Sequence, residues 1–215
     1  MKSRRLKDLY YASVGKLSIL SFCWHKMVPI TRFENGFLNI GCGAKYIDGM
    51  INIEGNIFRK KDIWLDITLG LPFPENTIQG IYASHVIEHF EADHVRKLFS
   101  EFYRVLNHTG VLRLIVPSLE YAIQAYQQGN VSKLPEWPDS YNSPGGRFNN
   151  FMLCRNQHLT MFDFSFLEEL LKAAGFSKVF RESPNRSQNF SRDHMRFESD
   201  PTLVHNSLYV ESVKE

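Results

Sequence analysis

The alternation of short apolar runs with helical stretches constrains the fold of this chain more than any other feature. The apolar run 37–40 ends in a glycine turn at residues 41–43. Further apolar runs follow at residues 50–54, 63–67, 78–84 and 111–116. The run 111–116 is apolar except for Arg113, which is typical of a strand in a parallel sheet that is covered on both faces. Strands that alternate with helices predict parallel pairing with right-handed crossovers.

The length and the second half of the chain complete the predicted fold class. At 215 residues, the chain is long enough for one buried core and too short for two domains of ordinary size. Helical spacing of apolar residues predicts helices over 95–106 and 166–174, and the segments 176–180 and 207–213 predict two more strands. We therefore predict a single α/β domain with a doubly wound, mostly parallel, seven-stranded Rossmann-like sheet.

The N-terminal segment differs in charge from the rest of the chain. Residues 1–32 contain seven Lys or Arg and a single acidic residue. Apolar positions between Leu6 and Trp24 recur at helical spacing, which predicts an amphipathic helix that packs on the domain and ends before Pro29. We therefore define a basic N-terminal arm at 1–35. Such an arm could also approach an anionic partner, including the surface of a membrane.

Two segments of the remaining domain, residues 36–215, lack a regular pattern. Residues 121–157 are rich in proline, glycine, asparagine and aromatic side chains, which predicts an irregular lid of the kind that selects a substrate. Residues 184–206 are polar and carry three arginines, so we expect an exposed loop there.

The cysteines and the apolar runs indicate a compartment. Cys23, Cys42 and Cys154 are odd in number and far apart, so they favour neither a disulfide framework nor a Cys-x-x-Cys metal site. A reducing, cytoplasmic setting fits this pattern. The apolar run 17–24 is short and no small-residue cleavage site follows it, so we expect no signal peptide. No run approaches the ~20 apolar residues that a membrane span requires.

The ends of the predicted strands point to a ligand site. In an open parallel sheet, ligands bind at the carboxyl ends of the strands. The residues at this edge are Gly41–Lys45, Glu54, Asp66 and Ser84–His89. Glycines at positions 41 and 43 allow a sharp turn and a close approach to a ligand, although a plain tight turn after a strand has the same pattern. A dinucleotide fingerprint would need a third glycine at position 46, which is Tyr46.

Several further segments follow the glycine turn in a fixed order. They are residues 64–67, 71–73, 81–89, 104–117 and 158–176. Together with the runs 38–43 and 51–54, this series resembles the class I S-adenosylmethionine methyltransferases, in particular the type 11-like group with a compact first motif. Only eleven positions separate Gly43 from Glu54, so the first helix of the class would be reduced to a short turn. The resemblance implies that 36–215 is a methyltransferase domain, with its acceptor region at 121–157.

The same resemblance implies S-adenosylmethionine as the cofactor and assigns residues to it. These are Asn39, Gly41, Cys42, Gly43, Glu54, Asp66, Ile67, Ser84 and His85. Gly41 and Gly43 would face the methionine part of the cofactor, and Glu54 its ribose. Asp66 with Ile67 would face the adenine. Taken alone, Glu54 is equally consistent with an exposed acidic residue at the end of a strand that binds no ligand.

Methyl transfer from a sulfonium needs a nucleophile held in line at about 3 Å in a dry site, and it needs no metal. We therefore assign no metal ligands. A hydroxyl or amine acceptor would need a nearby base, and His158, His85 and His89 are the candidates, with His158 first because it follows the lid. We expect transfer to an oxygen or nitrogen atom of a small-molecule or saccharide acceptor. A nucleic-acid acceptor is not favoured, because no nucleic-acid-binding signature is present.

Two other interpretations remain open. The string 85–89 fits the His-x-x-Glu-His pattern of a zinc peptidase class, which would place the ligands His85 and His89 and the base Glu88 on one helical turn. The string directly follows a predicted buried strand, however, and no third ligand is evident. The chain could also be a non-catalytic protein of the same fold that binds a partner, since fold does not imply function.

Overall fold

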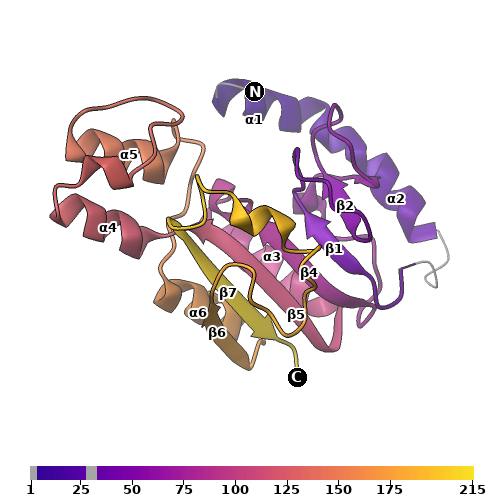
Figure 1. Cartoon of the computed structure of the whole chain (residues 1–215). Coiled ribbons are helices and arrows are strands. Elements are labelled where there is room, and N and C mark those ends of the chain that lie inside the picture. Colours follow the sequence, from indigo (N-terminus) through magenta and orange to yellow (C-terminus); the bar gives the residue numbers. More distant parts are fainter. Residues whose placement is uncertain (1–3, 28–32) are drawn as a thin grey trace.

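The computed structural model of the chain describes residues 4–27 and 33–215. Its centre is a sheet with the strand order β3-β2-β1-β4-β5-β7-β6 (Figure 1). The strands are β1 (Phe37–Ile40), β2 (Ile51–Glu54), β3 (Ile63–Trp64), β4 (Ile78–Ser84), β5 (Leu106–Pro117), β6 (Lys178–Glu182) and β7 (Ser207–Val213). Strands β1 to β5 pair in parallel, and β7 is antiparallel to both β5 and β6. The predicted α/β class and seven-stranded, mostly parallel sheet are confirmed.

Helices cover one face of this sheet and extend beyond two of its sides. The α-helices are α1 (Arg4–Ser13), α2 (Ile19–Met27), α3 (Ala92–Val105), α4 (Leu119–Gln127), α5 (Pro144–Leu153) and α6 (Phe164–Ala173). Helix α3 buries five apolar side chains at helical spacing, and with α6 it forms the main core against the strands. The turns η1 (Gly15–Ser18), η3 (Ile67–Leu69), η4 (Ile87–His89), η5 (Val131–Lys133) and η6 (Arg196–Ser199) are 3-10 helices. No helix in the described part of the chain is long and apolar enough to span a membrane.

The N-terminal segment forms two helices where the sequence predicted one. The turn η1 separates α1 from α2, because Gly15 is a poor helix former and a Cβ there would lie 2.7 Å from the ring of Tyr11. The hydroxyl of Ser18 accepts a hydrogen bond from the backbone N–H of Asp66 (2.9 Å), so the segment packs on the domain as predicted. Helix α2 ends at Met27, and Pro29 lies outside the described residues.

The predicted irregular lid at 121–157 contains α5 and most of α4, so the expectation of irregular structure was wrong over those helices, whereas the role of the segment as a lid stays a prediction. Helices α4 and α5 stand as a pair at one side of the sheet, and α2 lies at the other (Figure 1). Serine N-caps at Ser118 and Ser143 start the two helices. Pro144 occupies the first turn of α5, where a proline costs no hydrogen bond. The pair buries a small apolar core of its own.

The segment 184–206 is mostly irregular and exposed, as its polarity predicted, but a few of its residues are buried. Phe190 and Met195 are buried against Tyr82 and Tyr209 on the second face of the sheet. This segment covers the face that α3 and α6 leave open. The sequence did not predict this anchoring, because a few apolar side chains hold a segment whose other residues are polar.

A buried ionic network fixes the same segment. The guanidinium of Arg113 in β5 donates to both carboxylate oxygens of Glu198 and to Glu211, each at 2.7 Å. It also donates to the carbonyl oxygens of Arg186 and Ser183, both at 3.1 Å. All five N–H groups of Arg113 therefore have acceptors, as a fully buried guanidinium requires.

We expect Glu198→Ala to lower the free energy of unfolding by about 3–5 kcal/mol, because it leaves the buried charge of Arg113 without its bidentate partner. The matched control is Glu169→Ala, which removes an exposed carboxylate on α6 and should change stability by no more than about 0.5 kcal/mol. Urea denaturation of the three proteins measures both effects. Equal losses in the two variants would contradict the role of the network.

Candidate functional site

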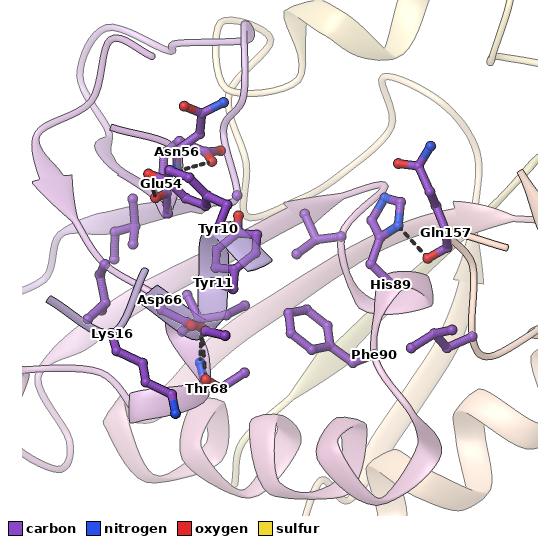
Figure 2. Close-up of a pocket in the computed structure, with 18 of the residues that line it drawn as sticks. Tyr10, Tyr11, Lys16, Glu54, Asn56, Asp66, Thr68, His89, Phe90 and Gln157 are labelled. Atoms are coloured by element: carbon purple, nitrogen blue, oxygen red, sulfur yellow. Dashed lines mark hydrogen bonds between the residues drawn. The ribbon is translucent and has the colours of Figure 1, made fainter. Parts of the chain in front are cut away.

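A pocket of about 570 Å³ lies at the carboxyl ends of the first four strands. Gly41 follows β1, Glu54 ends β2, Asp66 follows β3 and His85 follows β4, and all four line the pocket. Figure 2 shows Glu54 and Asp66 at one side of the pocket and His89 at the other. The parallel strand order therefore brings together residues that the sequence separates, at the edge where ligands bind in such sheets.

The floor of the pocket depends on a close approach between two turns. Gly41 has a φ of +61°, and a Cβ at this position would lie 2.7 Å from Cγ2 of Val86. Only glycine fits both the left-handed conformation and this contact. His85 also has a positive φ, of 56°, and its backbone N–H donates to the carbonyl of Ile115 at 2.8 Å. The chain thus turns sharply at the ends of both β1 and β4.

The two acids predicted for the cofactor stand at neighbouring strand ends. The buried carboxylate of Glu54 accepts backbone N–H groups from Gly43 (2.8 Å) and Asn56 (2.7 Å). Asp66 accepts from the backbone N–H (3.0 Å) and the hydroxyl (2.8 Å) of Thr68 and caps η3. These bonds hold both carboxylates in fixed orientations toward the pocket. No helix lies between β1 and β2, as the compact first motif predicted.

The predicted cofactor residues divide into two groups. Gly41, Glu54, Asp66, Ile67 and His85 line the pocket, whereas Asn39, Cys42, Gly43 and Ser84 do not. Asn39 donates to the carbonyl of Lys45 (2.8 Å) and to the side chain of Asn52 (2.9 Å). The thiol of Cys42 points to the carbonyl of Lys60 at 3.6 Å. Asn39 and Cys42 therefore stabilise the glycine turn without lining the pocket.

Two tyrosines of α1 also line the pocket, and the sequence did not predict them (Figure 2). The hydroxyl of Tyr10 donates to the carbonyl of Gly55 (3.0 Å) and accepts from the N–H of Ile57 (2.8 Å). Burial, together with the carboxylate of Glu54, raises the pKa of Tyr11. These contacts join residues 45 positions apart, so no local sequence signal marks them.

The three predicted catalytic histidines surround a buried carboxylate. Glu88, in η4, is 1% exposed, and Nδ1 of His85 lies 3.3 Å from its Oε1. The rings of His89 and His158 are in edge contact, with centroids 5.1 Å apart. The backbone N–H of Leu159 donates to the carbonyl of Glu88 at 2.7 Å, which fixes the segment that carries His158 against η4. His85 and His89 line the pocket, and His158 lies behind His89.

The helical arrangement expected of a zinc peptidase is absent from the described residues at 85–89. His85 has a left-handed backbone, and only a three-residue 3-10 turn follows. His85 and His89 therefore do not share a helical turn, and that part of the interpretation was wrong. A sharp turn must follow β4, and it leaves no room for a helix at this point.

The protonation states of this cluster follow from burial and charge. Burial alone would raise the pKa of Glu88, but the contact with His85 and the imidazoles of His89 and His158 outweigh it and lower the pKa to about 2. Burial lowers the pKa of His158 to about 4. A pKa of about 4 leaves the imidazole of His158 neutral at neutral pH.

Sequence comparison identifies the family of the chain. The profile of a family described as a methyltransferase domain matches residues 28–179. The chain therefore belongs to this family. A search of curated proteins finds none with significant similarity to the sequence.

Solved structures share the fold at low sequence identity. A SAM-dependent methyltransferase from Archaeoglobus fulgidus is 13% identical, with a TM-score of 0.51 over 96% of this chain and 98% of that one. A possible histamine N-methyltransferase from Thermotoga maritima is 14% identical, with a TM-score of 0.51 over 98% and 95%. An S-adenosylmethionine-dependent methyltransferase from Mesorhizobium loti is 15% identical, with a TM-score of 0.50 over 87% and 94%. Family and fold together define a class I methyltransferase, whose cofactor is S-adenosylmethionine.

The chemistry of the pocket fits this cofactor. The carboxylates of Glu54 and Asp66 offer acceptors for the hydroxyl and amino groups of an adenosine. Leu65 and Ile67 provide apolar surface beside them, and Gly41 leaves space for a ligand to approach the backbone. The volume of about 570 Å³ lies within the usual range of roughly 300–1,000 Å³ for ligand pockets.

We expect Glu54→Ala to weaken the binding of S-adenosylhomocysteine by about 10- to 100-fold, because a hydrogen bond to a charged acceptor is worth about 1.5–3 kcal/mol. Titration calorimetry measures the affinity. Glu75→Ala removes an exposed carboxylate from the turn before β4 and is the matched control, with unchanged affinity. Equal affinities in wild type and Glu54→Ala would remove Glu54 from the cofactor site.

Proposed function

We propose that the protein transfers a methyl group from S-adenosylmethionine to an oxygen or nitrogen atom of a small-molecule or saccharide acceptor. The observation that supports this most strongly is that one pocket has Glu54 and Asp66 at one side and His89 at the other, with His85 also in its lining. One bound molecule can then place its adenosine among acceptors of hydrogen bonds and its reactive end beside the histidines.

Glu54 and Asp66 would bind the adenosine through the carboxylate lone pairs that their contacts within the protein leave available. An ionised carboxylate offers about four acceptor sites. Glu54 uses two for the N–H groups of Gly43 and Asn56, and Asp66 uses Oδ1 for Thr68. The other sites suit the ribose hydroxyls at Glu54 and the adenine amino group at Asp66.

S-adenosylmethionine would supply an electrophilic methyl group on its sulfonium. A lone pair of the acceptor atom would form the new bond, and the electron pair of the carbon–sulfur bond would return to sulfur. The protein must orient the acceptor, exclude water and receive the acceptor's proton. His85, His89 and His158 stand at the side of the pocket where this proton would leave. A neutral imidazole is the form that accepts a proton.

Acceptor selection would fall to the α4–α5 pair and the segment that follows it. Gln157 and Leu159 line the pocket beside His89, and the carbonyl of Gln157 bonds to Nδ1 of His89 (Figure 2). The pair stands beside the sheet and packs on its own small core. This arrangement allows its surface to vary without disturbing the cofactor site.

We expect methyl transfer from tritiated S-adenosylmethionine to at least one member of a panel of saccharides, phenols, catechols and amines. His158→Ala should lower the rate by about 100-fold or more, as loss of a proton acceptor does, while the affinity for S-adenosylhomocysteine stays within about twofold of the wild-type value. Cofactor binding without transfer to any acceptor would contradict the proposal and favour the non-catalytic interpretation.

A further inference from the structure

We propose that Glu88, His89 and His158 bind a divalent transition-metal ion, such as Zn²⁺, which holds a hydroxyl oxygen of the acceptor beside the cofactor pocket. The role of this ion rests on the proposed function. The proposal differs from the expectation, made from the sequence, that methyl transfer uses no metal. One ligand atom of each residue lies within 4.8 Å of the other two. Two imidazoles and a carboxylate form a ligand set that Zn²⁺ and other first-row divalent ions accept.

The hydrogen bonds of the two histidines orient them as ligands. Nδ1 of His89 lies 3.0 Å from the carbonyl of Gln157, and Nδ1 of His158 lies 3.0 Å from the carbonyl of Met152. Because a carbonyl oxygen can only accept, these contacts assign the proton to Nδ1 in both rings and a lone pair to Nε2. Histidines that ligate metals commonly donate their other N–H to a backbone carbonyl in this way.

The carboxylate of Glu88 needs a cation. It is 1% exposed, and within the described residues neither of its oxygens has a donor in hydrogen-bond geometry. His85 provides the nearest contact, at 3.3 Å from Oε1. A buried charge is stable only when it is paired or coordinates a metal. The lone pairs of Glu88, His89 and His158 would repel one another across the cluster, and a bound cation removes that repulsion.

The backbone holds the three ligands in place. The N–H of Leu159 donates to the carbonyl of Glu88 (2.7 Å), and the hydroxyl of Thr160 donates to the carbonyl of Phe90 (2.7 Å). These bonds tie the segment that carries His158 to the turn that carries Glu88. In a tetrahedral zinc site with bond lengths of about 2.0–2.2 Å, ligand atoms are about 3.3–3.6 Å apart. The ligand atoms, which lie within 4.8 Å of one another, would therefore approach by up to about 1.5 Å when the ion binds.

The position of the cluster gives the ion its role. Three protein ligands leave at least one coordination position open. His89 lines the cofactor pocket, so an oxygen bound at that position would lie beside it. Coordination lowers the pKa of a bound hydroxyl. With His89 and His158 as ligands, the proton of that hydroxyl passes to His85, the pocket-lining imidazole that is not a ligand. The site thus favours an acceptor that presents a hydroxyl group.

The test titrates the full chain, purified through EDTA and dialysed, with Co²⁺ and Zn²⁺. We expect about one equivalent of either ion, with visible absorption bands for Co²⁺. Glu88→Gln and His158→Gln should each weaken binding by about tenfold or more. His108→Gln removes an exposed imidazole in β5 and is the matched control, with unchanged binding. Acetohydroxamate, a bidentate oxygen ligand, should change the Co²⁺ spectrum of the wild type.

Two measurements keep the outcomes distinct. Circular dichroism and calorimetry with S-adenosylhomocysteine establish that each variant is folded and retains its cofactor pocket. The metal site is overturned if the wild type retains less than about a tenth of an equivalent, or if both variants bind as the wild type does. An unchanged Co²⁺ spectrum with acetohydroxamate would overturn the open position. Metal binding without cofactor binding would contradict the proposed function but would support the metal site at Glu88, His89 and His158.

Discussion

The contact between Gly41 and Val86 is the constraint on which the rest of the site depends. The two residues follow β1 and β4, which are neighbours in the sheet, and a Cβ at position 41 would lie 2.7 Å from Val86. The missing side chain lets the two turns meet and forms the floor of the pocket. The same sharp turn after β4 directs His85 and His89 to that pocket, with Glu88 buried behind them. A larger residue at 41 would therefore disturb the cofactor side and the histidine side together.

Segments that are far apart in the sequence close the pocket from two directions. The tyrosines of α1 cover the side of Glu54, and the hydroxyl of Ser18 bonds to the backbone of Asp66. On the other side, the segment after α5 brings His158 against His89. The strand ends thus supply the residues at the base of the pocket, while the N-terminal helices and the segment after α5 close its two sides. This division fits one cofactor and an acceptor that enters from the histidine side.

Sequence reasoning found the parts of the structure that depend on local pattern. The predicted bounds of β4 and β7 match the structure because each is a run of buried strand residues between clear turns. Glu54 and Asp66 were found because a strand end is a local feature. Tyr11 was missed because its place in the pocket depends on a contact with a distant loop, and the importance of Glu88 emerged only when His158 was placed beside it. Polar composition also concealed the buried face of 184–206, because three or four side chains decide burial there.

We infer that the pocket between α1 and the strand ends binds S-adenosylmethionine. Hydrogen–deuterium exchange of the full chain, with and without S-adenosylhomocysteine, tests it most directly because it maps the bound surface. We expect slower exchange at residues 10–16, 41–56, 66–68 and 85–90, with no change in α6. Protection elsewhere, or no protection at saturating ligand, would contradict it.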